Sequence, residues 1–349
     1  MDKRTRFLGT MFGLAYGDTI SFASLFHRFH HADIPTRRHL FMWRQNSELG
    51  TMGISNLMLP FTHRMASETL EPYPTDDTEF ALLAMQAILE ADTLNQETLL
   101  NIWIEKILPI QEKVYVRFSE RAALDNLARG VFPPASGNDN PLHYEDAAVP
   151  RAVPIGLYCA GQPERARELA QLDAQITNAE DGIYAAQTMA VAIALLADGA
   201  SLDQALDRAR EQFPADSWIA HVDRIVQECL QQATTPEDLA LLMNQKVINT
   251  VYSYGSAAPE TLPAAFAITR ICEGEFHRAV PLANTLTKAS DSITAMVGAL
   301  CGCYQGVDVI SPLWREALSE CKGVCLPFME GAQLEALTLQ LLAKVENLK

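Results

Sequence analysis

Two evenly spaced glycine stripes limit how this chain can fold more than any other feature. Glycines stand at positions 9, 13 and 17, and again at positions 298, 302 and 306. A spacing of four residues places them on one face of a helix, although each glycine costs a helix interior about 1 kcal/mol relative to alanine. The stripes therefore predict two helices whose backbones approach closely. Similar stripes join membrane helices, but the flanks here are too polar and too short to span a bilayer.

Helical periodicity dominates the rest of the chain and predicts an all-α protein. After the acidic pair at 76 and 77, apolar residues recur at 80, 83, 84, 87 and 88, the spacing of one helix face. Segment 181–198 is almost wholly apolar and predicts a central buried helix. Further amphipathic stretches cover 96–108, 163–173, 201–212, 216–232, 236–250, 259–271, 275–286 and 330–347. Alternating strand patterns are nearly absent, and 28–50 and 130–146 are irregular segments of the kind that often carry function.

Two adjacent carboxylates, Asp76 and Asp77, stand between Thr75 and Thr78 where a proline-rich loop meets an apolar helix. Adjacent carboxylates repel each other, so a cation or a set of oriented donors must offset their charge. Oxygen ligands of this kind suit Mg²⁺ or Mn²⁺ rather than zinc. The alternative is helix capping, in which Thr or Asp side chains satisfy the first N–H groups of the helix. The residues alone leave both interpretations open.

Acidic residues also stand beside both glycine stripes. Asp18 directly follows the first stripe, and Asp291 with Ser292 opens the helix that carries the second. If the two stripes pack together, these acidic helix ends meet as well. The sequence therefore predicts that carboxylates from distant segments gather around one point.

The order of these motifs resembles that of the ADP-ribosylglycohydrolase family, which includes the dinitrogenase reductase-activating glycohydrolase. The resemblance covers nearly the whole chain and lies in residues 9–18 (Gly-x-x-x-Gly-x-Ala-x-Gly-Asp), 75–78 (Thr-Asp-Asp-Thr), 150–156 (Pro-Arg-Ala-Val-Pro-Ile-Gly), 254–265 and 291–306. It implies one compact all-α domain over residues 1–349, built as an orthogonal multi-helix bundle.

The resemblance also implies a metal site with departures from the family pattern. Its ligands would be Thr75, Asp76, Asp77, Asp291 and Ser292. Two acids of the pattern are missing, because Leu25 and Ala289 stand in their places. Fewer anionic oxygens weaken the binding of a second hard cation, so one Mg²⁺ or Mn²⁺ ion is expected rather than two. The ammonium of Lys288 could supply the missing charge, or be a solvated surface group. Asp146 and Ala147 replace an Asn-Gly pair of the pattern.

By the same resemblance, the chain is a metal-dependent hydrolase that cleaves the glycosidic bond between ADP-ribose and a protein side chain or a small acceptor. Either Asp76 or Asp77 would accept a proton from an ion-oriented water. The substrate contacts would come from two loops, whose residues could equally be ordinary loop residues. They are Ser136, Gly137 and Asn138, and Tyr254, Gly255 and Ser256. Because the metal site departs from the pattern, the alternative is a pseudo-hydrolase that binds ADP-ribose-like ligands or a protein partner without turnover.

Composition narrows the range of partners. The formal net charge is −16, which argues against an extended nucleic-acid surface, since phosphate contacts need a basic stripe. No apolar run reaches the 18 residues that suggest a membrane span, and no leader-like apolar run is expected at the N-terminus. The seven cysteines form no Cys-x-x-Cys pair and are expected to be reduced thiols of a cytoplasmic protein. The expected partners are ADP-ribose or ADP-ribosylated substrates, with no nucleic acid and no membrane.

Overall fold

The computed structural model describes residues 1–28, 52, 72–248, 256–286 and 290–347, without the side chains of 23–28, 290 and 291. Within these ranges the regular structure is helical, and β-structure is limited to two isolated bridges. The all-α prediction is confirmed. The α-helices are α1 (Lys3–Arg28), α3 (Asp76–Glu90), α4 (Gln96–Ile102), α5 (Phe118–Ala128), α6 (Ala135–Asn138), α7 (Ala148–Tyr158), α8 (Pro163–Ala174), α9 (Asp181–Asp198), α10 (Leu202–Arg210), α11 (Trp218–Gln232), α12 (Pro236–Lys246), α13 (Ala258–Ile271), α14 (Phe276–Ala283), α15 (Ser290–Gln305), α16 (Pro312–Ala317) and α17 (Leu334–Asn347).

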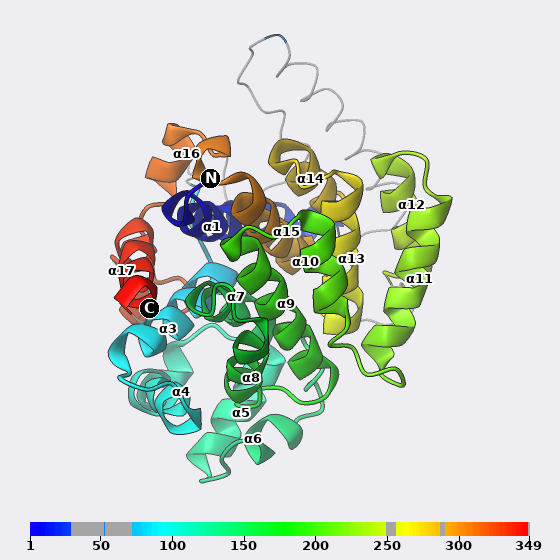
Figure 1. The fold of residues 1–349 in the computed structure, drawn as a ribbon. Helices are drawn as coiled ribbons and strands as arrows, with labels where there is room; N and C mark the ends of the chain where they lie inside the picture. The colour runs from blue at the N-terminus through cyan, green and yellow to red at the C-terminus, as the bar shows by residue number, and fades with distance from the viewer. Residues whose placement is uncertain (29–51, 53–71, 249–255, 287–289, 348–349) are drawn as a thin grey trace.

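The first glycine stripe lies on α1, and Gly298 and Gly302 of the second lie on α15, which ends just before Gly306. The two helices pack against each other along their length (Figure 1). A Cβ atom added at Gly9 would lie closer than 3.0 Å to the carbonyl oxygen of Gly302, and one at Gly13 would meet that of Gly298 in the same way. The clash is reciprocal, because added Cβ atoms on α15 would meet the carbonyl oxygens of α1. The predicted close approach of two helix backbones is confirmed.

Helix α9 forms the centre of the fold, as its apolar sequence predicted. It packs against α7, α8, α10, α13 and α15, and most of its side chains are buried (Figure 1). It ends at Gly199, whose φ of 100° is the left-handed conformation that terminates many helices. The buried apolar side chains form one contiguous cluster that extends from Phe7 on α1 to Val345 on α17. The division of the chain into a single domain stays a prediction.

Side chains at the first residues fix where several of the outer helices begin. Ser201 and Thr235 close capping boxes at the starts of α10 and α12, and Pro236 takes the first position of α12. The stretch predicted as one helix over 96–108 is shorter than expected. It leaves α-helical geometry after Ile102 and continues as a π turn (Trp103–Ile107) and a 3₁₀ turn (Leu108–Lys113), the latter with proline in its first turn.

The fold also bears on the cysteines and on the question of membrane-spanning helices. All seven cysteines are buried free thiols. Among the helices of the described residues, none combines the length and the hydropathy needed to cross a membrane.

Candidate functional site

A carboxylate from α1 caps the start of α3. Asp18 is buried, and its Oδ2 accepts hydrogen bonds from the backbone N–H groups of Thr75 at 2.8 Å and Thr78 at 3.1 Å. The same oxygen accepts the Thr78 hydroxyl at 2.6 Å, while the Thr75 hydroxyl bonds to Oδ1. Thr75 is the N-cap residue of α3, but its own side chain makes no cap bond. The start of α3 is therefore capped, as one of the two interpretations predicted. The cap is not local, because Thr75 donates to a carboxylate 57 residues away in the sequence.

The surroundings of Asp18 destabilise the ionised form of its carboxyl. Burial is the largest effect and, with the negative charge of Asp76, raises the pKa of the Asp18 carboxyl to about 7. The hydrogen bonds from Thr75 and Thr78 oppose this shift because they stabilise the ionised form. Asp18 thus holds α1 and α3 together through bonds that compensate for its desolvation.

We expect Asp18→Ala to lower the free energy of unfolding by about 2 kcal/mol, because buried N–H groups at the start of α3 lose their acceptor. Asp2→Ala is the matched control, since Asp2 also accepts a backbone N–H, that of Thr5 at 2.7 Å, but in an exposed position. Its effect should be much smaller, because water can take the place of the carboxylate at an exposed N–H. Urea denaturation monitored by circular dichroism measures both. Equal losses for the two variants would contradict the assigned role of Asp18.

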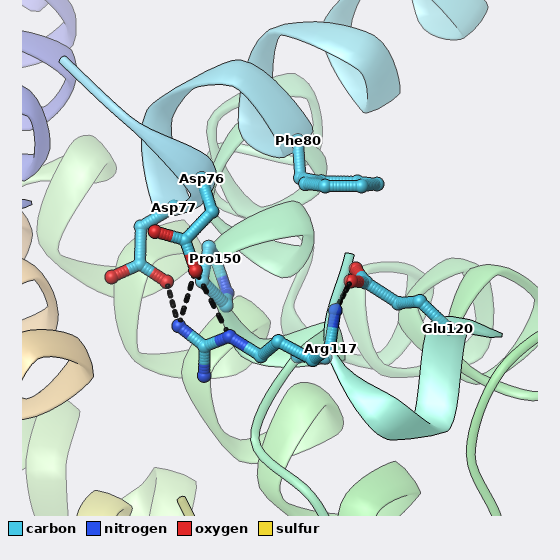
Figure 2. Close-up of a pocket in the computed structure, with 7 residues that line it drawn as sticks. Asp76, Asp77, Phe80, Arg117, Glu120 and Pro150 are labelled. Carbon is cyan, nitrogen blue, oxygen red and sulfur yellow. Dashed lines mark hydrogen bonds and ion pairs between the residues drawn. The ribbon is translucent and has the colours of Figure 1, made fainter. Parts of the chain in front are cut away.

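The guanidinium of Arg117 lies against the adjacent aspartates of α3 (Figure 2). Its Nε and Nη2 donate to Asp76 Oδ2 at 3.0 and 2.9 Å, and Nη2 also donates to Asp77 Oδ1 at 3.1 Å. Its Nη1 donates to the Asp146 carboxylate and to the Ser292 hydroxyl, the latter at 2.9 Å. One arginine therefore joins the start of α3, the segment before α7 and the start of α15.

These charges lie mostly out of water. The exposed fraction of the side chain is 12% for Arg117, 17% for Asp76, 2% for Asp77 and 0% for Asp146. At such burial, Coulombic interactions are several times stronger than between surface groups. The cation that the adjacent carboxylates require is thus provided by an arginine side chain among the described residues.

The backbone of Arg117 is fixed at the start of α5. Its N–H donates to Glu120 Oε2 at 3.0 Å, and its carbonyl accepts the N–H of Arg121 at 2.9 Å. Two residues further on, the N–H of Ser119 donates to Glu145 Oε2 at 2.5 Å. Burial raises the pKa of Glu120 to about 7, against the opposing effect of the Arg151 and Arg117 charges. The side chain of Arg117 therefore starts from an anchored position.

A hard divalent ion does not fit the described residues while Arg117 lies here. Mg²⁺ demands near-octahedral oxygen ligands, and the oxygens of the two adjacent aspartates accept hydrogen bonds from the guanidinium instead. The Thr75 hydroxyl, another predicted ligand, bonds to Asp18. Within the described side chains, no three or more His, Cys, Asp or Glu are grouped to hold a metal ion. The side chain of Asp291 is outside the described part, and the single Mg²⁺ or Mn²⁺ ion stays a prediction.

The first predicted substrate loop packs against residues 176–178. The Ser136 hydroxyl donates to the carbonyl of Ile176 at 2.8 Å, and an added Cβ at Gly137 would collide with the backbone of Asn178. Asn138 ends α6 and is exposed. Buried bonds of this kind explain the segment structurally, and its contact with substrate stays a prediction.

Only part of the second predicted loop is described. The carbonyl of Ser256 accepts the backbone N–H of Asp146 at 2.9 Å, so this residue adjoins the Arg117 cluster through its backbone. Tyr254, Gly255, Lys288 and Ala289 lie outside the described residues, as does the side chain of Leu25. What was predicted of them stays a prediction.

A small cavity opens beside the acidic pair (Figure 2). Its empty space of about 170 Å³ includes open solvent, so it is a shallow opening and not an enclosed pocket. It is lined by Asp76, Asp77, Phe80, Arg117, Glu120, Ala147 and Pro150. The described residues therefore border a small opening beside the acidic pair and do not enclose a whole ligand.

The sequence motifs did not identify Arg117 or Asp146 as site residues. A single arginine before a helix, as in Val116-Arg117-Phe118, carries no signature. Asp146 is visible in the sequence as a departure from the Asn-Gly pattern, but its partner is 29 residues away. That departure, an added acid close to an acidic site, is the one signal that could have suggested a nearby basic side chain.

Comparisons with known proteins complete the description of the site. A family model described as ADP-ribosylglycohydrolase matches residues 1–348. A solved structure described as an ADP-ribosylglycohydrolase-related protein complex matches with a TM-score of 0.61 and 20% identity, over 99% of this chain and 99% of that chain. At this identity the structural match supports the fold alone. No curated protein matches the chain.

Proposed function

Because the chain belongs to the ADP-ribosylglycohydrolase family, as its motifs predicted, we propose that the cavity beside Asp76 and Asp77 receives the ribose of an ADP-ribosyl group. Carboxylate oxygens accept hydrogen bonds from the paired hydroxyls of a ribose. Asp76 keeps 17% of its side chain exposed at this cavity. The opening is small, so most of the ligand, including its nucleotide part, would extend beyond the described lining.

Of the two activities predicted from the sequence, we favour recognition of ADP-ribosyl groups without metal-dependent turnover. The observation that carries this choice is the guanidinium of Arg117, which donates hydrogen bonds to both candidate bases. A carboxylate paired with a guanidinium is a weaker general base, because the positive charge stabilises its ionised form. The chain would then read an ADP-ribosyl mark, or hold free ADP-ribose, rather than remove it.

The second candidate is the hydrolase itself, which the glycohydrolase family favours. In this function an Mg²⁺ or Mn²⁺ ion would orient water for attack on the glycosidic bond between ADP-ribose and its acceptor. Asp76 and Asp77 border the cavity, where a general base would be needed. This activity requires Arg117 to leave the two aspartates, which separates it experimentally from the first candidate.

Binding and release are measured on the same samples. The chain is titrated calorimetrically with ADP-ribose, and incubated with ADP-ribosylated arginine and serine peptides with and without Mg²⁺ or Mn²⁺. We expect binding with no release, and at least tenfold weaker binding for Asp76→Asn, because one hydrogen-bonding charge is lost. Asp125→Asn is the control, since this aspartate of α5 is exposed and outside the cavity.

Other outcomes decide against the favoured proposal. Metal-dependent release of ADP-ribose that disappears in Asp77→Ala would establish the hydrolase instead. Neither binding nor release would refute both candidate functions. A loss of binding in Asp125→Asn as large as that in Asp76→Asn would show that the ligand does not use the cavity.

A further inference from the structure

We propose that Arg117 is the resident cation of this site and excludes a divalent metal ion from it. Its part in holding an ADP-ribosyl ligand rests on the proposed function, whereas the exclusion of metal does not. The proposal concerns the charge at the meeting point of α3, α5 and α15, where the sequence predicted a metal ion.

The contacts of Arg117 use all three nitrogens of the guanidinium. Nε and Nη2 share Asp76 Oδ2, Nη2 reaches Asp77, and Nη1 reaches Asp146 and Ser292. A guanidinium stays protonated at any physiological pH and holds carboxylates in a planar fork. Asp76, Asp77 and Ser292 are also three of the five predicted metal ligands. A metal ion at this place would therefore compete with the guanidinium for the same three side chains.

Arg117 is not placed to swing aside easily. Its side chain is 12% exposed and its backbone is held by Glu120 at the start of α5. Its departure would leave Asp146, which is fully buried, without the guanidinium that faces it. Removing one partner of a buried ion pair is unfavourable, since the other charge stays desolvated. The arrangement therefore favours the arginine over an incoming ion that must first lose its own hydration shell.

Electrostatic repulsion explains why the guanidinium of Arg117 and a divalent ion would not be bound here at the same time. A divalent ion at hydrogen-bonding distance from Asp76 and Asp77 would lie within a few ångströms of the guanidinium. Like charges at that separation repel strongly in a poorly hydrated site. Without Arg117, by contrast, the carboxylates of Asp76 and Asp77 would lose the guanidinium that they share, and anionic oxygens are the ligands that hard cations prefer. The proposal thus predicts that removal of Arg117 creates a metal site.

The experiment compares the binding of Mg²⁺ and Mn²⁺ to four proteins without any nucleotide ligand. They are the wild type, Arg117→Ala, the double variant Arg117→Ala/Asp146→Asn, and the control Arg121→Ala. The double variant removes one positive and one negative charge, so it keeps the net charge and avoids an uncompensated Asp146. Arg121 is on the same helix and donates to the backbone carbonyls of Gln111 and Val114. Calorimetry gives the Mg²⁺ affinity, electron paramagnetic resonance counts bound Mn²⁺, and circular dichroism reports folding.

We expect at least tenfold tighter binding of Mn²⁺ and Mg²⁺ to the double variant than to the wild type, with one ion per chain, and no change for Arg121→Ala. A wild type that binds either ion as tightly as the double variant overturns the proposal, as does a folded double variant with no gain. If neither arginine 117 variant folds, the wild type still decides, because one tightly bound ion per chain would overturn the proposal and the lack of one would support it. ADP-ribose binding by the wild type in the presence of EDTA tests the proposed function separately. Its failure leaves the metal result intact.

Discussion

Gly13→Val is expected to prevent α1 and α15 from packing in their native arrangement, with a loss of more than about 4 kcal/mol of stability. A Cβ atom at position 13 would lie closer than 3.0 Å to the carbonyl oxygen and carbon of Gly298, and both belong to backbone rather than to a flexible side chain. Relief requires the two helices to separate, and the close packing on both sides of this contact would then be lost. Valine adds two further methyl groups to the same clash. Soluble yield and thermal unfolding monitored by circular dichroism measure the effect.

Gly130→Ala is the control for the general effect of replacing a glycine. Gly130 has a φ of +78° and nothing within 4 Å of an added Cβ, so the substitution strains the local backbone without a packing clash. It should cost about 1–2 kcal/mol. If Gly13→Val unfolds within a few degrees of the wild type, α1 and α15 do not depend on this close contact.

The glycine stripes and the helix periods made most of the fold predictable, because both signals are local. A stripe of glycines on one helix face allows another helix backbone to approach closely, and the partner stripe on α15 was visible in the same sequence. The apolar run of α9 likewise permits only a buried position. The early end of α4 was less visible, since the sequence over 96–108 keeps its amphipathic character while Pro109 limits the helix that can follow.

The sequence singled out the acidic pair of the candidate site but not the side chain that faces it. It predicted that Asp76 and Asp77 need a counter-charge, and it left a metal ion and helix capping open. The structure contains an Asp18 cap and an arginine counter-charge instead of a local cap. Both the cap and the counter-charge depend on hydrogen bonds between residues that are 41 to 60 positions apart in the sequence. Nothing in the spacing of one sequence reports which basic side chain reaches a given acid, so Arg117 could only be found in three dimensions.

The second large effect is expected for Arg151→Met, which should lower the free energy of unfolding by about 3–5 kcal/mol. Arg151 is fully buried, and its Nε donates to Asp173 Oδ2 at 2.8 Å. Its Nη2 donates to the Thr177 hydroxyl at 2.8 Å, and Glu120 lies 3.6 Å from Nη1. Methionine fills similar space without the charge, so two buried carboxylates lose their counter-ion. Urea denaturation at pH 7 measures the loss.

The loss relative to the wild type should grow as the pH rises above about 7. Burial raises the pKa of Glu120 to about 7, and the Arg151 charge is the largest effect that opposes this. Without Arg151 the folded pKa rises further, so above about pH 7, where the wild-type carboxyl ionises, the variant continues to lose stability. Below about pH 7 the carboxyl is protonated in both folded proteins, and its part of the difference disappears.

Arg270→Met provides the matched control for this pH dependence. Arg270 also pairs with an aspartate, Asp203, at 3.0 Å, but the side chain of Asp203 is 75% exposed. Water can solvate the remaining carboxylate there, so the loss should stay at about 1 kcal/mol and change little with pH. Similar losses for both arginines, or a loss for Arg151→Met that does not grow above about pH 7, would contradict the role of the Arg151 charge. The fold would then depend on the packing of the Arg151 side chain against Trp103, whose ring centroid lies 5.0 Å away.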